Sequence, residues 1–590
     1  MSYYSVIAAL FDKPYDQMQG FINDLFRDEM FESFVAQKGL EKIYRMPLSE
    51  TEKEALIVQI SCAFNKHREE TLLIYKFIKT FFPIADELFA QIKGLIKCTF
   101  DDSLSLFYYY LGQFVFDNPL TIGTAKWILV SAATTVLRND LPCISNSLSM
   151  TIATSARKTE MLEKCYLLAI KLGVLREKYD AICFGREKIE AIVYDQKPVL
   201  FLKLKNQDIE YGLKYGAAYH SYVSSAKKEG SPGIIHQFYK CYICKYCFFT
   251  HIDEASKELV LSILERQFAA RNLTDMFFYY TGDIPSYLFS MVSYLYAHML
   301  ILILCSSKTM ELVTYSTVRK EMLWGERIAD SEFDLLIKRL RESSIFQNWI
   351  QSNEEGFIIG RWQFDYDISV SEIVNKIALD SKADSKFGKI SDCFGKNTYE
   401  SIVRGIAKQS GWNVVPHSIH KKENARSTTD VDLIAYKAGV VLIGQIKVAN
   451  CGRTPYEIWK GKQVLDRAIN QSRLSMDILK KDIQLLFSIL KKYNIVSSKS
   501  EIKTLVPIII TRSSYYIGMG HNSGIPIISL DMFQQIMNYL SNISDPEIIV
   551  SSIFEPFELY DLPVHNNITE SHIEQEEYSI IYEEILDEDA

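Results

Sequence analysis

The stretch D430-V-D-L-I-A-Y-K-A-G-V-V-L-I-G-Q-I-K447 determines how the C-terminal part of this chain is expected to fold. Two runs of apolar residues flank a Lys-Ala-Gly break at residues 437–439. A short break that contains glycine, between two such runs, predicts an antiparallel hairpin. Alternate residues of a strand face the same side, so Gln445 and Lys447 are expected to point the same way. The hairpin would also bring Asp432 to the same end of the sheet.

The sequence on either side predicts a mixed α/β domain over residues 385–545. Apolar residues at helical spacing predict two helices, one over 394–411 that ends at Gly411 and a long one over 455–481. Buried strands and a closing helix are indicated by the apolar runs at 413–419, 430–439, 440–448, 504–513 and 525–541. The resulting α-β-β-β-α-β order implies a small mixed sheet flanked by helices.

The polar residues of this region suit the hydrolysis of a phosphodiester. That reaction usually needs a hard cation, Mg²⁺ or Mn²⁺, which is held by carboxylate and carbonyl oxygens and lowers the pKa of a bound water. Asp432 is the expected principal ligand, with the Gln445 side-chain oxygen and the Ile446 backbone carbonyl as further ligands. Lys447 would orient or deprotonate the water or stabilise the transition state. Glu400, in the preceding helix, would bind the metal directly or through water.

These residues, Glu400, Asp432 and Gln445-x-Lys447, resemble the PD-(D/E)xK, or restriction-endonuclease-like, nuclease superfamily. The acidic residue that usually precedes x-Lys is replaced here by Gln445, and this departure resembles the Mrr-like restriction endonucleases. The resemblance covers residues 390–540, about a quarter of the chain. It implies a restriction-endonuclease-like α/β fold and metal-dependent cleavage of nucleic acid.

Two features of the motif leave alternatives open. Replacing a carboxylate with Gln445 removes a negative charge from the metal's surroundings and should weaken metal binding. Either Glu400 compensates for this loss, or the domain binds nucleic acid without cutting it. Asp430 is an alternative to Asp432, because both are expected to face the same side of the strand.

Polar and basic residues of the long helix form a second candidate group. In the resembling nucleases, such residues of this helix lie near the active site and contact phosphate, whereas the alternative is a solvated helix face. The same two interpretations hold for His417, His420, Lys421 and Lys422, which are expected in a loop before the Asp432 strand. The candidates on the helix are Lys460, Lys462, Gln463, Arg467 and Gln471.

Composition and charge support a multidomain globular protein with a basic region. The 590 residues are 48% hydrophobic and 23% charged, which excludes disordered and collagen-like classes. The formal charge of −8 becomes +1 without residues 570–590, which hold nine acidic residues and no Lys or Arg. Residues 386–480 carry 16 Lys and Arg against 8 Asp and Glu, a balance typical of a domain that binds polyanions.

Residues 1–310 are expected to form a mainly helical region that senses a trigger or serves assembly, through a protein partner or a second copy of the chain. The uncharged run at 284–307 is long enough for a membrane span, but its Ser, Tyr and His residues favour a buried helix. With no signal peptide apparent at the N-terminus, a cytoplasmic protein without membrane contact is expected.

Residues 311–365 predict two helices and a hairpin with a turn at 353–356, the plan of a winged-helix-like module. Lys338, Arg339 and Arg341 would then face phosphate. The alternative is a small helical module that packs against its neighbours and exposes its basic residues to solvent.

Two further segments are given less functional weight. Cys241, Cys244, Cys247 and His251 are ligand types that suit zinc, but their spacing lacks the second ligand pair of structural zinc sites, so zinc is not expected. Residues 546–590 are expected to form an acidic tail that is disordered or forms a short amphipathic helix.

The leading hypothesis is a Mg²⁺-dependent endonuclease, most readily a DNase, that serves as an effector in bacterial restriction or antiviral defence. The defence role rests on analogy of domain plan. A first alternative is a non-catalytic protein that binds nucleic acid or serves assembly through a degenerate nuclease fold. A second alternative is an RNA-directed nuclease, because the same chemistry cleaves both polymers.

Overall fold

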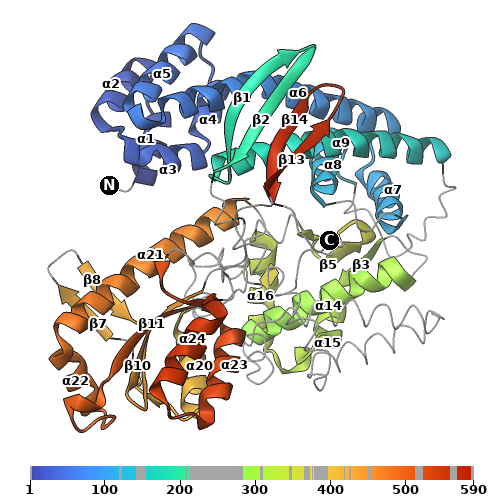
Figure 1. Ribbon diagram of the computed structural model, residues 1–590. Coiled ribbons are helices and arrows are strands. Elements are labelled where there is room, and N and C mark those ends of the chain that lie inside the picture. Colours follow the sequence, from blue (N-terminus) through green and yellow to red (C-terminus); the bar gives the residue numbers. More distant parts are fainter. Residues whose placement is uncertain are drawn as a thin grey trace.

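The chain is mostly helical with several small mixed sheets, a multidomain layout of helical and α/β parts (Figure 1). The computed structural model describes residues 3–117, 123–140, 155–205, 210, 284–305, 310–343, 349–363, 373–374, 377, 396–417, 419–423, 427–448, 455–511, 523–558 and 568–585. Among these residues, no helix has the length and apolar character that crossing a membrane requires.

The N-terminal region is built around the long helix α6, which contacts α4, α5, α8 and α9. One continuous apolar core joins these helices. Its described helices are α1 (Tyr3–Phe11), α2 (Tyr15–Leu25), α3 (Phe31–Ala36), α4 (Gly39–Arg45), α5 (Glu50–Ala63), α6 (Arg68–Thr99), α7 (Leu104–Asp117), α8 (Gly123–Val136) and α9 (Ala156–Cys183).

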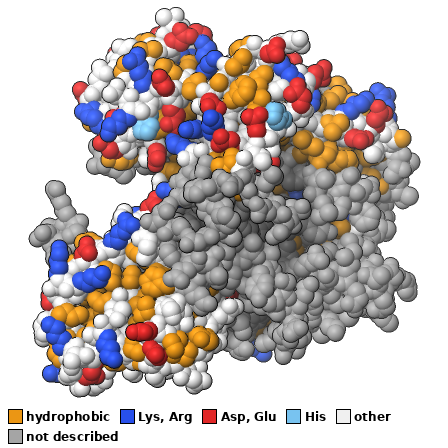
Figure 2. Space-filling view, in the orientation of Figure 1, with side chains coloured by type: hydrophobic (Ala, Val, Ile, Leu, Met, Phe, Trp, Pro, Cys, Tyr) orange, Lys and Arg blue, Asp and Glu red, His pale blue; other side chains and the backbone are white. Residues whose placement is uncertain are grey.

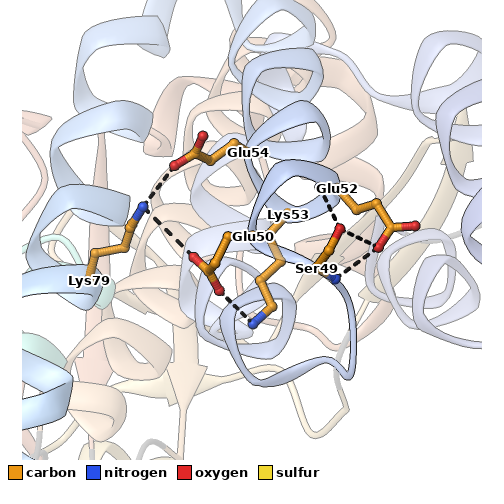
Figure 3. A network of polar contacts seen from close by, with 6 residues as sticks. All are labelled: Ser49, Glu50, Glu52, Lys53, Glu54 and Lys79. Carbon is orange, nitrogen blue, oxygen red and sulfur yellow. Dashed lines mark hydrogen bonds and ion pairs between the residues drawn. The ribbon is translucent and has the colours of Figure 1, made fainter.

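Helix α5 begins at a capping box, drawn in Figure 3. The Ser49 hydroxyl accepts a hydrogen bond from the Glu52 backbone N–H at 3.3 Å, and the Ser49 backbone N–H donates to the Glu52 carboxylate at 2.8 Å. Lys79 of α6 lies 2.8 Å from the Glu54 carboxylate and 3.8 Å from that of Glu50. The capping box satisfies backbone donors at the start of α5, and the ion pairs link α5 to α6.

The prediction that the acidic C-terminal segment is disordered or forms a short helix is wrong for residues 568–585. These residues form a hairpin that belongs to the N-terminal region. Strands β13 (Ile568–Glu574) and β14 (Ser579–Ile585) join β1 (Glu187–Asp195) and β2 (Lys197–Leu204) in a sheet of order β1-β2-β14-β13. Figure 1 shows this red hairpin lying beside β2. Strand β14 runs parallel to β2.

Apolar side chains and lysines explain why this acidic segment folds. Tyr578 and Ile580 are fully buried in the core of the N-terminal region. The Tyr578 hydroxyl donates to the Lys171 carbonyl at 2.7 Å, and Lys171 pairs with Glu577 at 2.8 Å. Lys197 pairs with Glu574 in the same way. The local sequence could not indicate these pairings, because the lysines that pair with the glutamates lie about 400 residues away in sequence.

Within the uncharged run at 284–307, residues 284–305 form a helix, as predicted. Helix α14 (Ile284–Cys305) has every side chain from Tyr287 to Ile303 buried. It packs against α15 (Tyr315–Glu321), α16 (Asp330–Glu342) and β5 (Gly356–Gly360).

The two helices and the hairpin that the sequence predicts after α14 are present. The hairpin pairs β4 (Gln351–Ser352) with β5, and Asn353 closes its turn by accepting hydrogen bonds from the Glu355 and Gly356 N–H groups. A further strand, β3 (Met310–Thr314), pairs with β5 and completes a sheet of order β3-β5-β4.

The C-terminal α/β region contains a five-stranded sheet of order β12-β11-β10-β9-β6. The hairpin predicted around residues 437–439 is confirmed, since β9 pairs antiparallel with β10, while β11 runs parallel to β10. The elements are α20 (Lys396–Gln409), β6 (Asn413–Val414), β7 (Ile419–Glu423), β8 (Ser427–Val431), β9 (Leu433–Lys437), β10 (Val440–Lys447), α21 (Pro455–Lys481), α22 (Ile483–Lys492), β11 (Thr504–Thr511), β12 (Ile527–Ser529), α23 (Leu530–Tyr539) and α24 (Pro546–Glu558).

Each face of this sheet is covered by its own group of helices. Leu442 and Ile446 of β10 share a core with α20, α23 and α24, whereas Val441 and Ile443 share one with α21 and α22. The prediction of a loop before Asp432 is wrong in part, because residues 419–423 form β7 and pair with β8. The long helix that was expected at 455–481 is α21 and is continuous.

Candidate functional site

Asp432 lies between β8 and β9 and is completely buried, at 0% exposure. Its carboxylate Oδ2 accepts a hydrogen bond from the Ile446 backbone N–H at 2.8 Å. Its own backbone N–H donates to the Gly444 carbonyl at 3.0 Å. The two bonds fix this carboxylate against the end of β10, because backbone groups of a paired strand have little freedom to move.

Lys447 brings a cation to the same place. Its Nζ lies 3.9 Å from Asp432 Oδ2 and donates hydrogen bonds to Gln445 Oε1 at 3.1 Å and Gln471 Oε1 at 2.9 Å. Gln445 is 1% exposed. The ammonium group is therefore held by two amide oxygens beside a buried carboxylate. The prediction that Asp432, Gln445 and Lys447 meet at one end of the sheet is confirmed.

The alternation along β10 explains this meeting. Val441 and Ile443 pack toward α21, so Gln445 and Lys447, which continue the odd-numbered series, lie on the same face. Helix α21 packs across that face and supplies Gln471. Asp430, the alternative to Asp432 as metal ligand, lies in β8 opposite His420. Its side chain lies outside the described part of the structure.

Glu400 is linked to the site by Arg404, a residue that the sequence analysis did not identify. Its carboxylate Oε2 lies 2.6 Å from Nη2 of Arg404, one turn further along α20. The same Nη2 donates to the Asp432 backbone carbonyl at 2.8 Å. The side chains of Glu400 and Arg404 are 6% and 13% exposed. The i,i+4 spacing of an acidic and a basic residue on a predicted helix is the signal that would have indicated Arg404.

The donor set around Asp432 fits a hard divalent cation. A carboxylate, the Gln445 amide oxygen and the Ile446 backbone carbonyl are oxygen ligands of the kind that Mg²⁺ and Mn²⁺ take. Within the described residues, no group of three or more His, Cys, Asp or Glu side chains is placed to hold a metal. The two carboxylates are matched by two cations, Arg404 and Lys447, so the charge balance predicts low affinity for a metal ion.

The helix candidates differ in how they relate to this site. Gln471 contacts Lys447, as described above. Lys462 pairs instead with Asp466 at 2.7 Å. At 3.6 residues per turn, Lys460 and Arg467 lie within about 40° of Gln471 around the helix, whereas Lys462 lies about 180° away.

The remaining helix candidates contact α21 itself. Arg467 Nε donates to the Gln463 carbonyl at 3.1 Å, and Arg467 is exposed whereas Gln463 is half-buried. Lys460 Nζ lies 4.8 Å from the centroid of the Trp459 ring. Figure 2 shows basic side chains together with acidic ones over the region of α21 and α22 at the lower left, and a similar mixture over the N-terminal helices at the top.

Helix α21 also contacts the N-terminal region. Phe184, at the C-terminal end of α9, lies 5.3 Å from Tyr456 and 5.9 Å from Trp459, measured between ring centroids. In Figure 1, α21 extends from the C-terminal region up toward the N-terminal helices. The helix that supplies Gln471 therefore also makes a contact with the N-terminal region.

The basic residues of α16 are engaged with acidic neighbours. Arg339 lies 3.0 Å and Lys338 4.0 Å from the Glu342 carboxylate. Lys338 and Arg341 line a groove of about 510 Å³ together with Asp334 and Glu342, so the charges in it balance. This balance favours the solvated interpretation of Lys338, Arg339 and Arg341 over phosphate binding. The cysteine and histidine candidates at 241–251 lie outside the described residues.

The whole chain has been compared with models of protein families, with curated proteins and with solved structures. None of the three comparisons finds a match. What this chain does is therefore inferred from the residues around Asp432.

Proposed function

We propose that the chain is a metal-dependent endonuclease, most readily acting on DNA, with a PD-(D/E)xK-like catalytic domain over residues 385–545. The observation that carries the proposal is the position of Lys447 Nζ, 3.9 Å from the buried Asp432 carboxylate and hydrogen-bonded to Gln445. An ammonium group beside a carboxylate and an amide oxygen at one sheet end supports phosphodiester hydrolysis. The order of α20, the β9–β10 hairpin, α21 and parallel β11 supports the proposed fold.

Asp432, Gln445 and the Ile446 carbonyl would hold the metal ion, which when bound supplies charge neutralisation at the phosphate and a more acidic water. Lys447 orients the attacking water and stabilises the negative charge that develops on the phosphate oxygens. Gln445 and Gln471 hold the Lys447 ammonium group in place through the two hydrogen bonds at Nζ. The water oxygen forms a bond to phosphorus and gives up one proton to solvent, the P–O bond to the leaving group breaks, and the leaving oxygen takes up one proton from solvent.

The proposed substrate is a polyanion because residues 386–480, which include the site, carry 16 Lys and Arg against 8 Asp and Glu. Lys460 and Arg467 lie on the flank of α21 that also carries Gln471, where they would neutralise phosphates without reading sequence. The remaining parts are assigned by analogy: the N-terminal helices would sense a trigger or a partner, residues 311–365 would form a winged-helix-like module, and the protein would act in the bacterial cytoplasm in restriction or antiviral defence.

A second candidate is a non-catalytic nucleic-acid-binding or assembly protein. The observation that favours it is the balance of two cations, Arg404 and Lys447, against the two carboxylates, together with an amide at Gln445. A third candidate is an RNA-directed nuclease, which the same site chemistry would serve.

The three candidates are separated by one cleavage experiment. Fluorescently labelled single- and double-stranded DNA and RNA of one sequence are incubated with the full chain and with Asp432→Asn, in Mg²⁺, Mn²⁺ or EDTA. The proposal predicts cleavage of DNA by the wild type only, abolished by EDTA, with binding retained by the variant. Cleavage confined to RNA would establish the third candidate. Metal-independent binding without cleavage of any substrate would establish the second.

A further inference from the structure

Arg404 ties together the two elements that carry the acidic residues of the site. Its Nη2 lies 2.6 Å from Glu400 Oε2 on α20 and 2.8 Å from the backbone carbonyl of Asp432. Both side chains of this ion pair are largely buried, at 6% exposure for Glu400 and 13% for Arg404. Charge-assisted hydrogen bonds with little exposure to water are among the stronger polar contacts in proteins.

The two carboxylates belong to opposite faces of the sheet. Glu400 belongs to α20, which packs with Leu433 and Ile446 on one face. The Asp432 carboxylate, in contrast, lies beside Lys447, whose Nζ is bound by Gln471 of α21 on the other face. The contact that Arg404 makes with Asp432 is to its backbone carbonyl and not to its carboxylate. Arg404 therefore lies between Glu400 and the strand that carries Asp432.

The guanidinium group of Arg404 is positively charged, so the ion pair neutralises the Glu400 carboxylate. A divalent ion that used Glu400 as a ligand would have to displace Arg404 from the carboxylate. It would also disturb the hydrogen bond to the Asp432 carbonyl. The Asp432 carboxylate and the Gln445 side chain take part in neither of these two Arg404 contacts, so a divalent ion held by them would leave both contacts in place.

We propose that Arg404 is a positioning residue that removes Glu400 from the set of metal ligands, so that the site binds one divalent ion through Asp432 and Gln445. This inference rests on the proposed function and specifies its metal requirement. It changes the role expected of Glu400, which becomes the anchor of Arg404 and not a ligand. Arg404 in turn holds the start of β9 against α20.

The inference is tested by titrating the full chain with Mn²⁺ in the absence of nucleic acid and measuring free Mn²⁺ by electron paramagnetic resonance. The wild type should bind one ion. Glu400→Gln should change the affinity by less than about threefold, whereas Asp432→Asn should weaken it by about 100-fold or more. Arg404→Gln should raise the affinity or add a second ion, and Glu400→Gln in that background should cancel the gain.

Two controls separate this role from general effects of charge or folding. Lys408→Gln removes one positive charge from an exposed position of the same helix and should leave Mn²⁺ binding unchanged. Thermal unfolding of each variant identifies any that has lost its fold. The single variant Glu400→Gln, which leaves Arg404 in place, keeps the test decisive if Arg404→Gln does not fold.

Three outcomes would overturn the inference. A loss of about tenfold or more in Mn²⁺ affinity in folded Glu400→Gln would make Glu400 a ligand, and two ions bound to the wild type would have the same meaning. If the wild type also cleaves DNA, only this inference fails and the proposed function stands. A wild type that binds no Mn²⁺ and cuts nothing would overturn both.

Discussion

At the scale of single residues, the chemistry of this site depends on how Lys447 is held. Its ammonium group donates hydrogen bonds to two amide oxygens and lies beside the Asp432 carboxylate, which is 0% exposed. Burial strengthens these interactions and also makes their loss expensive in free energy, because a buried charge that loses its partners is not rescued by water. The position of Lys447 is therefore fixed by its neighbours and not by its own flexible side chain.

Replacing Gln471 should loosen Lys447 without removing it. Gln471→Ala deletes one of the two amide acceptors at Nζ, so kcat for DNA cleavage should fall by about 10- to 100-fold while KM changes little. Asn470→Ala, an exposed change at the adjacent position of α21, is the matched control and should leave both constants unchanged. A rise in KM at constant kcat would instead mean that Gln471 contacts the substrate.

The residues of the site could be predicted from sequence to different degrees. The two-residue periodicity of a strand was enough to place Gln445 and Lys447 on one side, and the hairpin break was enough to bring Asp432 to them. Arg404 was missed because a basic residue on a helix usually faces solvent, and only the packing of α20 against β9 turns it toward Asp432. The ion pair that neutralises Glu400 depends on that packing.

At the scale of elements, β9 and β10 approach so closely at Gly444 that no side chain fits. A Cβ at this position would lie 2.8 Å from the Cβ of Leu433, and Leu433 is the residue that follows Asp432 in the chain. Gly444 also accepts the Asp432 N–H through its carbonyl. The glycine therefore allows the close pairing that positions the carboxylate.

Gly444→Ala should destabilise the C-terminal region by about 1–3 kcal/mol, because the added methyl group must push the hairpin strands apart. Thermal unfolding and the cleavage rate should both reveal the change. Gly405→Ala on α20 is the matched control: a Cβ there meets nothing within 4 Å, and alanine favours a helix over glycine by about 1 kcal/mol. Equal melting temperatures for the two variants would contradict the packing described for Gly444.

The two flanks of α21 are expected to contribute differently to DNA binding. Arg467→Ala and Lys460→Ala, on the flank that carries Gln471, should each weaken DNA binding and reduce the slope of log affinity against log salt by about 1. Lys462→Ala removes the same charge from the opposite flank, where Lys462 pairs with Asp466, and should have little effect. Fluorescence anisotropy at several salt concentrations measures both quantities. An equal loss in all three variants would mean that only total charge matters.

Some elements could not be predicted because their signals are not local. The β7–β8 hairpin is polar and lies where a loop was expected, and β6 contains only two residues. Strand β3 forms through its pairing with β5, which lies more than 40 residues further along the chain. Periodicity identifies long helices such as α14 and α21 well, whereas short paired strands depend on their partners.

At the scale of the whole molecule, the C-terminal hairpin returns the chain to the region where it began. Strand β14 completes the sheet of β1 and β2, and Tyr578 enters the core of the N-terminal helices. The α/β region thus lies between two segments that fold together, and α21 contacts α9 through Phe184. Within the described residues, the contact of Phe184 with Tyr456 links the N-terminal region to the helix that supplies Gln471.

Tyr578→Ala should destabilise the N-terminal region by about 3–5 kcal/mol, since it removes a fully buried aromatic ring. It also removes the hydrogen bond to the Lys171 carbonyl. Limited proteolysis should release the C-terminal hairpin faster from this variant than from the wild type. Glu570→Ala, at an exposed position of β13, should behave as the wild type. Unchanged proteolysis of Tyr578→Ala would contradict the docking of the hairpin.

The central claim, that Asp432 and Lys447 form the catalytic site of a metal-dependent nuclease, is tested most directly by plasmid cleavage. Supercoiled plasmid is incubated with Mg²⁺ and the wild type, Lys447→Ala or Lys462→Ala, and nicked and linear products are measured over time. We expect cleavage by the wild type and Lys462→Ala that EDTA abolishes, and a rate lower by at least about 100-fold for Lys447→Ala. Equal cleavage by the wild type and Lys447→Ala would contradict the claim.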